Sequence, residues 1–376
     1  MPTLYIAVTN HGFGHATRAA SVASEIRSRA KEIGIPLKLI LATKAPGWLL
    51  DSYLDDYEHR QVSFDVGVLQ SDSLTMDKPA TLRAIREIQT QEAAIVEAEA
   101  AFLISEGVDL ILADIPPLMG KIAKAANVPC WFMGNFGWDF IYRPWVQEHA
   151  EFHEISDWIG ECWQGGDRTF RLPFAEPMQG LPNVTNVGLT GGTPKYSADY
   201  LRSLLKTDAP PEKTVLLTFG GLGLSSIPYH ALKHFPDWQF VTFDRQAPNL
   251  PNLYSVSDHK MRPVDWMVVC DRIFSKPGYS TFAEACLLDK GVITITREGF
   301  AEAQILITGI QDYAHHRIID AQDFFEGDWS FLTDDLRPPR KREKLDKNGQ
   351  GEIATAAIHH LKTCVAAPIE NLHSRI

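Results

Sequence analysis

The chain has 376 residues, 45% of them hydrophobic, and a formal net charge of -11 at pH 7. This length and apolar content suffice for two ordinary domains, and the acidic balance argues against nucleic acid as a partner. No apolar run approaches the roughly 20 residues of a transmembrane helix, and no signal segment is evident, so we expect a cytoplasmic protein; peripheral membrane association stays open. The five cysteines are scattered without Cys-x-x-Cys spacing, which predicts reduced thiols and neither disulfides nor a metal site.

Strand-like apolar runs alternate with helical patterns in two successive series. The first has strands at 4–9, 36–42, 61–66, 110–113 and 130–133 and helices at 18–33 and 81–105; the second has strands at 215–219, 239–243, 253–256, 272–274 and 291–296 and helices at 228–234 and 281–288. Such alternation predicts an α/β protein with parallel sheets. We expect an N-terminal domain at 1–190, a linker rich in glycine and proline at 191–212, a second domain at 213–350, and a C-terminal helix and tail at 351–376 that can pack back on the first domain.

A histidine lies at the first turn from strand to helix, in the segment Asn10-His11-Gly12-Phe13-Gly14-His15-Ala16-Thr17-Arg18. The glycines permit a tight turn and close approach to a ligand, which makes Gly14 a candidate contact of the donor, and a helix N-terminus favours a neutral imidazole. His15 is therefore a candidate general base, with a helix cap as the alternative. His11 has no comparable partner in the sequence.

A carboxylate follows a later buried strand of the same domain, at Asp114 in the segment Ala113-Asp114-Ile115-Pro116-Pro117. The carboxyl ends of parallel strands share one edge of the sheet, where ligands bind. Asp114 is therefore expected to orient the imidazole of His15 and to stabilise its protonated form. The alternative is an aspartate that caps the helix starting near Leu118. No Gly-x-Ser-x-Gly motif is present, so a serine hydrolase is not expected.

Two glycine-rich turns in the second domain are candidate phosphate sites. The first, at 219–226, contains Gly220 and Gly221 and lacks the Gly-Lys-Ser/Thr ending of a Walker loop. The second opens a helix at 275–285. Its candidate phosphate contacts are Lys276, Gly278, Ser280 and Thr281, and Glu284 is placed to accept hydrogen bonds from a ribose diol. Alternatively, Thr281 and Glu284 form a capping box.

Polar side chains also follow the strand at 292–296. Glu298, Glu302 and Gln304 suit the hydroxyl groups of a sugar, although a polar loop with a helix cap has the same pattern.

An aromatic block at 131–145 is a candidate acceptor pocket, because ring faces stack on sugars and apolar acceptors. Asn135, Trp138 and Asp139 are its candidate contacts. Core packing is the alternative, with Asp139 and Arg143 forming an ion pair.

These motifs together resemble the two-domain GT-B glycosyltransferases, in which two Rossmann-like domains face a central cleft. The similarity is greatest to the UDP-sugar enzymes of plants and microbes and to the peptidoglycan GlcNAc transferase. Gly14-His15 matches the turn that holds the catalytic base, Asp114 matches the aspartate that orients it, and the run Gly278, Ser280, Thr281 and Glu284 matches the donor motif. Lys276 stands where the plant enzymes have a histidine, and Glu298, Glu302 and Gln304 replace their Asp-Gln pair.

A resemblance over almost the whole chain is to the glycosyltransferase-like N-terminal part of plant L-arabinokinases. It is carried by the segments 11–18, 135–142 and 276–279. Their phosphoryl-transfer domain follows this region, so we do not expect kinase activity here.

The resemblance implies an inverting, metal-independent transferase that moves a sugar from a nucleotide diphosphate sugar, with UDP as the expected nucleotide, to an unknown acceptor hydroxyl. No cofactor is expected besides this co-substrate. The alternatives are a non-catalytic nucleotide-sugar sensor and a nucleotide-sugar epimerase.

Overall fold

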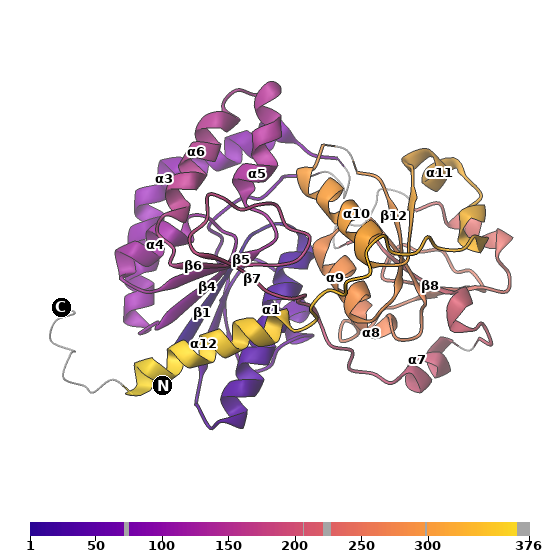
Figure 1. Cartoon of the computed structure of the whole chain (residues 1–376), viewed down its shortest axis with the longest axis horizontal. Coiled ribbons are helices and arrows are strands. Elements are labelled where there is room, and N and C mark those ends of the chain that lie inside the picture. Colours follow the sequence, from indigo (N-terminus) through magenta and orange to yellow (C-terminus); the bar gives the residue numbers. More distant parts are fainter. Residues whose placement is uncertain (71–74, 206, 221–226, 298, 367–376) are drawn as a thin grey trace.

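The computed structural model of the chain describes residues 1–70, 75–205, 207–220, 227–297 and 299–366. It contains two α/β domains, each built around a parallel sheet with helices packed on it (Figure 1). The two sheets have related strand orders, β3-β2-β1-β4-β5-β6-β7 and β10-β9-β8-β11-β12-β13. The predicted α/β class is therefore confirmed.

The first sheet consists of β1 (Thr3–Val8), β2 (Lys38–Ala42), β3 (Glu58–Arg60), β4 (Leu110–Asp114), β5 (Cys130–Gly134), β6 (Arg168–Arg171) and β7 (Val184–Asn186). Its helices are α1 (Gly12–Glu32), α2 (Gly47–Asp51), α3 (Lys78–Ser105), α4 (Met119–Ala126), α5 (Trp138–Tyr142) and α6 (Phe152–Trp163), with a 3-10 helix η1 at Arg143–Gln147. The strand predicted at 61–66 is wrong: β3 ends at Arg60.

The centre of the first sheet explains the sequence pattern of its strands. β1 lies between β2 and β4 and is buried along its whole length, as an apolar strand covered on both faces should be. On α1, the apolar residues Ala19, Val22, Ile26 and Ala30 are all buried, whereas Ile33, expected on the same face, is exposed at the C-cap. The helix begins at Gly12, six residues before the predicted start, so that His15 lies in its first turn.

The second sheet consists of β8 (Thr214–Thr218), β9 (Gln239–Thr242), β10 (Leu253–Ser255), β11 (Arg272–Ser275), β12 (Gly291–Ile295) and β13 (His316–Ile319). The remaining helices are α7 (Ala198–Leu205), α8 (Pro263–Trp266), α9 (Tyr279–Leu287), α10 (Ala301–Tyr313), α11 (Ala321–Glu326) and α12 (Gly349–Ala366), with 3-10 helices η2 (Pro211–Lys213), η3 (Tyr229–His234) and η4 (Ser330–Thr333). The helix predicted at 228–234 is thus a 3-10 helix, and the one predicted at 281–288 begins two residues earlier.

The last helix returns to the first domain. α12 packs against α1 and contacts β4, and Figure 1 shows it crossing back from the second domain. Ile353, Ala354, Ala357 and Leu361 are buried in this contact region. Within the described ranges, no helix combines the length and apolar character needed to cross a membrane.

Candidate active site

The strand order of the first sheet brings the two predicted catalytic residues together. β1 and β4 are neighbours, with Val8 opposite Asp114, and the amide of Thr9 donates to the backbone carbonyl of Asp114 over 3.1 Å. The chain then turns into α1 through Gly12, whose φ of +61° is in the left-handed region that glycine adopts readily. This turn places the first residues of α1 directly over the end of β4.

His15 and Asp114 form a buried pair. The Nδ1 of His15 lies 2.8 Å from Oδ1 of Asp114, and the two residues are 9% and 0% exposed. Burial alone would raise the pKa of Asp114, but the charges of Arg18 and then His15, with their hydrogen bonds, hold it below its ordinary value. Asp114 does not cap the next helix, since α4 has Leu118 as its N-cap and no side-chain cap.

Arg18 is a site residue that the sequence reasoning did not single out. Its Nε and Nη2 donate to the two carboxylate oxygens of Asp114 over 2.7 and 2.5 Å, and the residue is 2% exposed. The signal was present in the spacing, because residues three apart on a helix lie on the same face, as His15 and Arg18 do. A buried arginine in a fork to a carboxylate fixes both groups.

The predicted acceptor contact Asn135 instead connects the domains. Its side-chain oxygen accepts a hydrogen bond from Nη1 of Arg18 over 3.0 Å, and its Nδ2 donates to Oε1 of Glu302 over 2.7 Å. Glu302, predicted to read the donor sugar, belongs to the first turn of α10 in the second domain. Both side chains are buried, so the chain of contacts from Asp114 to Glu302 is internal.

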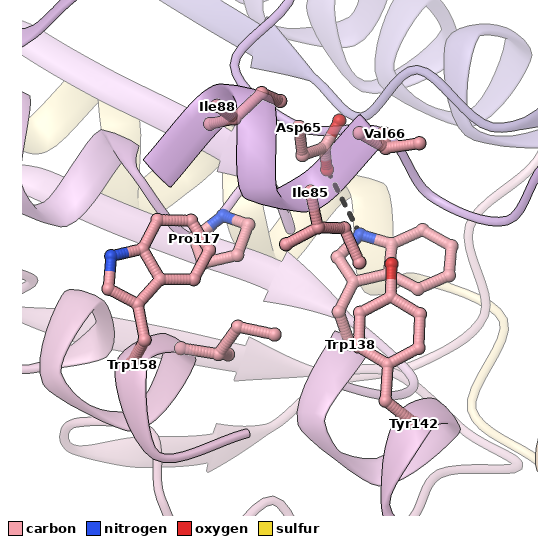
Figure 2. Close-up of a pocket in the computed structure, with 9 residues that line it drawn as sticks. Asp65, Val66, Ile85, Ile88, Pro117, Trp138, Tyr142 and Trp158 are labelled. Atoms are coloured by element: carbon pink, nitrogen blue, oxygen red, sulfur yellow. Dashed lines mark hydrogen bonds between the residues drawn. The ribbon is translucent and has the colours of Figure 1, made fainter. Parts of the chain in front are cut away.

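Trp138, the second predicted acceptor contact, lies in the core beneath the histidines. It is 1% exposed, and its indole N–H points to Oγ1 of Thr9 and Oδ2 of Asp65, each at 3.0 Å. Figure 2 shows Trp138 and Asp65 on the wall of a cavity of about 10 Å³, which has room for about one water molecule. The rings of Trp138 and His15 lie 6.3 Å apart, so the indole supports the imidazole from within the core.

Asp65 is a second buried carboxylate that the sequence reasoning missed. It accepts hydrogen bonds from the hydroxyl of Thr9 and the amide of Asn10 besides Trp138. Burial raises the pKa of Asp65 to about 6, against the opposing effect of these hydrogen bonds and of His15. No sequence motif indicates Asp65, because the strand before it, β3, has only three residues.

Asp139, the third predicted acceptor contact, faces Arg143. The two side chains form an ion pair at 3.4 Å within one turn of helix, with Arg143 largely exposed. This ion pair is the alternative to an acceptor contact that the sequence analysis gave for Asp139.

His11 has partners that the sequence could not reveal. It is the N-cap of α1, its Nδ1 accepts the amide hydrogen of Val68 over 3.2 Å, and its ring stacks on Phe300 of the second domain, 5.9 Å away. Loss of hydration, followed by the charges of His15, Lys276 and Arg297, lowers the pKa of His11 well below its ordinary value. His11 is thus a neutral side chain in a positively charged environment.

Lys276 and Arg297 bring positive charge to the same region from the ends of β11 and β12. Burial and, after it, the charge of Arg297 lower the pKa of Lys276 to about 7, while Glu302 opposes the change. Arg297 lies over the ring of Phe300, 4.2 Å from its centroid. Two basic side chains in one place are a common arrangement for binding an anion.

Three helix N-termini meet beside these cations. α1, α9 and α10 begin after His11, Gly278 and Phe300, and none of these N-cap residues makes a side-chain capping bond. Uncapped helix N-termini carry partial positive charge and attract anions. Since α9 is capped at Gly278, the capping box proposed for Thr281 and Glu284 is not formed; Thr281 is a half-buried residue of the first turn.

Ser280 joins the two domains. Its hydroxyl donates to the backbone carbonyl of Gly14 over 2.7 Å, so the predicted donor contacts Gly14 and Ser280 touch each other. A Cβ atom added at Gly14 would lie 3.2 Å from the Ser280 hydroxyl. The small size of both residues allows α1 and α9 to meet end to end.

Glu284 lies beneath the segment that connects the domains. It is 4% exposed, and its Oε1 accepts the amide hydrogen of Gly192 over 3.0 Å. Burial raises the pKa of Glu284 to about 7, although the Gly192 hydrogen bond and Arg262 oppose this. The carboxylate predicted to bind ribose therefore has a backbone partner in this structure.

The remaining predicted donor contacts lie at the same edge of the second sheet or beyond the described ranges. Gly220 follows β8 and is exposed with φ +84°, a value that favours glycine. Gln304 is exposed on α10. Gly221 and Glu298 lie outside the residues that the structure describes.

A larger cavity of about 670 Å³ lies away from all of these residues, between α12 and the start of β5 and β6, where Trp131, Arg168 and His360 line it. No group of three or more histidine, cysteine, aspartate or glutamate side chains in the described part is arranged to hold a metal ion.

The fold is that of the GT-B glycosyltransferases. The chain superposes with a TM-score of 0.62 on a glycotransferase of kitacinnamycin, at 15% identity and with 96% of this chain and 100% of the other covered. The calicheamicin glycosyltransferase CalG4 gives a TM-score of 0.59 at 14% identity, covering 96% and 98% of the two chains. UGT2 of Phytolacca americana, solved with UDP-2fluoro-glucose and pterostilbene, gives 0.58 at 13% identity, covering 96% and 94%.

In sequence, the chain is similar to an L-arabinokinase of Arabidopsis thaliana, with 27% identity over 334 residues. The match covers 86% of this chain but only 31% of the arabinokinase, so the chain spans about a third of that relative. No protein-family model matches the chain.

Proposed function

We propose that this chain is an inverting glycosyltransferase that moves a sugar from a nucleotide diphosphate sugar, with UDP as the nucleotide, to an acceptor hydroxyl without a metal ion. The observation that carries the proposal is the buried His15–Asp114 pair of one domain, at 2.8 Å, beside the cations Lys276 and Arg297 of the other. A base beside a site for a diphosphate is what this reaction requires.

His15 is the general base of this proposal. It removes the proton of the acceptor hydroxyl as the oxygen attacks the anomeric carbon, and the bond from that carbon to the diphosphate breaks. Asp114 stabilises the imidazolium that forms. Because one displacement replaces the diphosphate by the acceptor oxygen on the opposite face, the configuration at the anomeric carbon inverts.

The second domain binds the donor. Lys276, Arg297 and the N-terminus of α9 neutralise the departing diphosphate, a form of electrostatic stabilisation that is worth several kcal/mol in enzymes, on the order of 3. Ser280 and Thr281 in the first turn of α9 supply hydroxyls, and Glu284 one turn later accepts hydrogen bonds from the ribose. Asn135 and Trp138 hold the catalytic pair in place from the core.

The relatives support this assignment at the level of the fold. UGT2 of Phytolacca americana was solved with UDP-2fluoro-glucose and pterostilbene, so one structure with this fold holds a UDP-sugar analogue together with a second small molecule. The two domains of the present chain touch through Ser280 and Gly14. When the donor binds, either it displaces this hydrogen bond or the two domains move apart.

Thermal-shift screening of UDP, GDP and ADP sugars identifies the donor, because a ligand of the folded state raises the apparent melting temperature. Release of UDP with candidate acceptors then tests transfer, and NMR of the product tests inversion. Because the proposed transfer needs no metal ion, we expect UDP release to persist in the presence of EDTA. Binding without UDP release would indicate a sensor, and a changed UDP-sugar without acceptor product would indicate an epimerase; either result would overturn the proposal.

A further inference from the structure

The guanidinium of Arg18 contacts more side chains of the site than an ion pair with Asp114 alone would need. Its guanidinium donates twice to Asp114, donates through Nη1 to Asn135, and lies 2.9 Å from Nδ1 of His15 through Nη2. It is fully enclosed, so each contact replaces hydration that the ion has lost.

Two of the elements around Arg18 belong to the second domain. The guanidinium lies 4.9 Å from the ring centroid of Tyr279 at the start of α9, within the range of a cation–π contact. Through Asn135 it is also connected to Glu302 on α10. The group that fixes Asp114 is therefore itself held from across the domain boundary.

We propose that Arg18 is a positioning residue that fixes the tautomer of His15 and makes this arrangement depend on contact between the two domains. This proposal rests on the proposed function only in calling His15 the base. Neither domain completes the arrangement alone: the first supplies His15, Asp114, Arg18 and Asn135, and the second supplies Tyr279 and Glu302.

Two groups face Nδ1 of His15: Oδ1 of Asp114 at 2.8 Å, which only accepts, and Nη2 of Arg18 at 2.9 Å, which only donates. Because Nη2 already donates to Oδ1, we assign Oδ1 as the partner of Nδ1, so that this ring nitrogen carries the proton. With the proton on Nδ1, the ring donates to that oxygen, and the oxygen also accepts from Nη2 of Arg18. Nε2 is then left as the acceptor that a general base needs. The ring of His11 also lies near the imidazole, with the two ring centroids 6.2 Å apart.

Histidine NMR on the intact chain, labelled with ¹⁵N, tests the tautomer without turnover. The His15 signals are assigned by their loss in His15→Gln. We expect the Nδ1–H form in the unmodified protein. In Arg18→Gln, the donor that shares Oδ1 of Asp114 with the ring is gone, so signals of the Nε2–H form should appear beside those of the Nδ1–H form.

Two further variants separate charge from geometry. Arg18→Lys keeps the charge but cannot donate in a fork, so the mixture of tautomers and the lower rate should both persist. Arg27→Gln is the matched control, since Arg27 lies on the same helix and pairs with exposed Asp56 at 2.7 Å. It should change neither the tautomer nor the rate. An Nε2–H tautomer in the unmodified protein, or an unchanged tautomer in folded Arg18→Gln, would overturn the proposal.

The rate tests the connection to the second domain. Arg18→Gln should lower kcat by about 10- to 100-fold, part of the 10² to 10⁴ that a general base contributes, with little change in donor KM. Asn135→Ala leaves both Arg18–Asp114 contacts but separates Arg18 from Glu302, and it should lower kcat less while keeping the Nδ1–H tautomer. Unchanged kcat in Asn135→Ala would refute the dependence on domain contact. If the unmodified protein transfers no sugar, the proposed function fails, but the NMR result still tests whether Arg18 fixes the tautomer of His15.

Discussion

The hydroxyl of Ser280 donates to the carbonyl oxygen of Gly14 over 2.7 Å and connects the first turns of α9 and α1 across the two domains. These residues are 266 positions apart in the chain, and both belong to motifs expected to bind the donor. The contact therefore places the candidate base and the candidate phosphate-binding residues on the two sides of a single junction.

This junction is sensitive to the size of the two side chains. Gly14→Ala brings a Cβ to 3.2 Å from the Ser280 hydroxyl, so it should destabilise the closed arrangement, and it should do so less when Ser280 is already alanine. We expect a coupling of about 0.5–1.5 kcal/mol in the double-mutant cycle of unfolding free energies. Additive effects would show that the two residues do not meet in solution.

His15→Ala should reduce turnover by about 10² to 10⁴ while leaving the affinity for UDP nearly unchanged, because His15 acts on the acceptor and not on the nucleotide. Stopped assays for UDP release and calorimetric titration with UDP give the two quantities. The matched control is His153→Ala, which removes an exposed histidine paired with Asp157 at 3.1 Å on α6. Equal turnover in His15→Ala and His153→Ala would remove His15 from the mechanism.

UDP affinity should fall as pH rises above 7. Lys276, with its pKa lowered to about 7, loses its charge in the free protein over this range, and a diphosphate prefers the protonated form. Each pH unit above 7 should then weaken binding by up to about tenfold until the bound lysine also titrates. Calorimetry between pH 7 and 9 measures the slope.

The slope should be much flatter in Lys276→Met than in the surface control Lys233→Met, which keeps the dependence on pH. A slope that survives in Lys276→Met would assign the titration to another group.

Glu284 should make the protein less stable as pH rises. Its pKa is about 7 in the folded chain against 4.5 in an unfolded one, so its contribution is fully present below pH 4.5 and is lost as pH rises through 7. Glu284→Gln retains an oxygen for the Gly192 amide and cannot ionise. Relative to the unmodified protein, the variant should gain roughly 1–3 kcal/mol of stability between pH 5 and 8.

Apparent melting temperatures at pH 5 and 8 test this, with the exposed Glu212→Gln as control. A difference in melting temperature that is the same at both pH values would show that Glu284 is ionised in the folded protein throughout.

The local sequence predicted much of the fold because the apolar pattern of a covered parallel strand or an amphipathic helix is visible in short segments. β1 and the apolar face of α1 are examples. Where the pattern was short or polar, the prediction failed: β3 has only three residues, and a 3-10 helix replaced the expected helix at Tyr229–His234.

The pairing of His15 with Asp114 was predictable because both follow buried strands, and the ends of parallel strands meet at one edge of a sheet. The sequence by itself thus determined the two α/β domains, the residue types at their carboxyl edges, and the resemblance to GT-B enzymes. Spacing along α1 places Arg18 on the same helix face as His15, but tertiary structure alone decided which distant side chains these residues and their neighbours contact. Arg18 lies against Asp114, Asn135 reaches Glu302 of the other domain, and Trp138 is buried beneath the histidines instead of facing an acceptor. The physical reason is that these contacts join residues about 100 to 170 positions apart, and no local periodicity encodes which distant group will neutralise a buried charge.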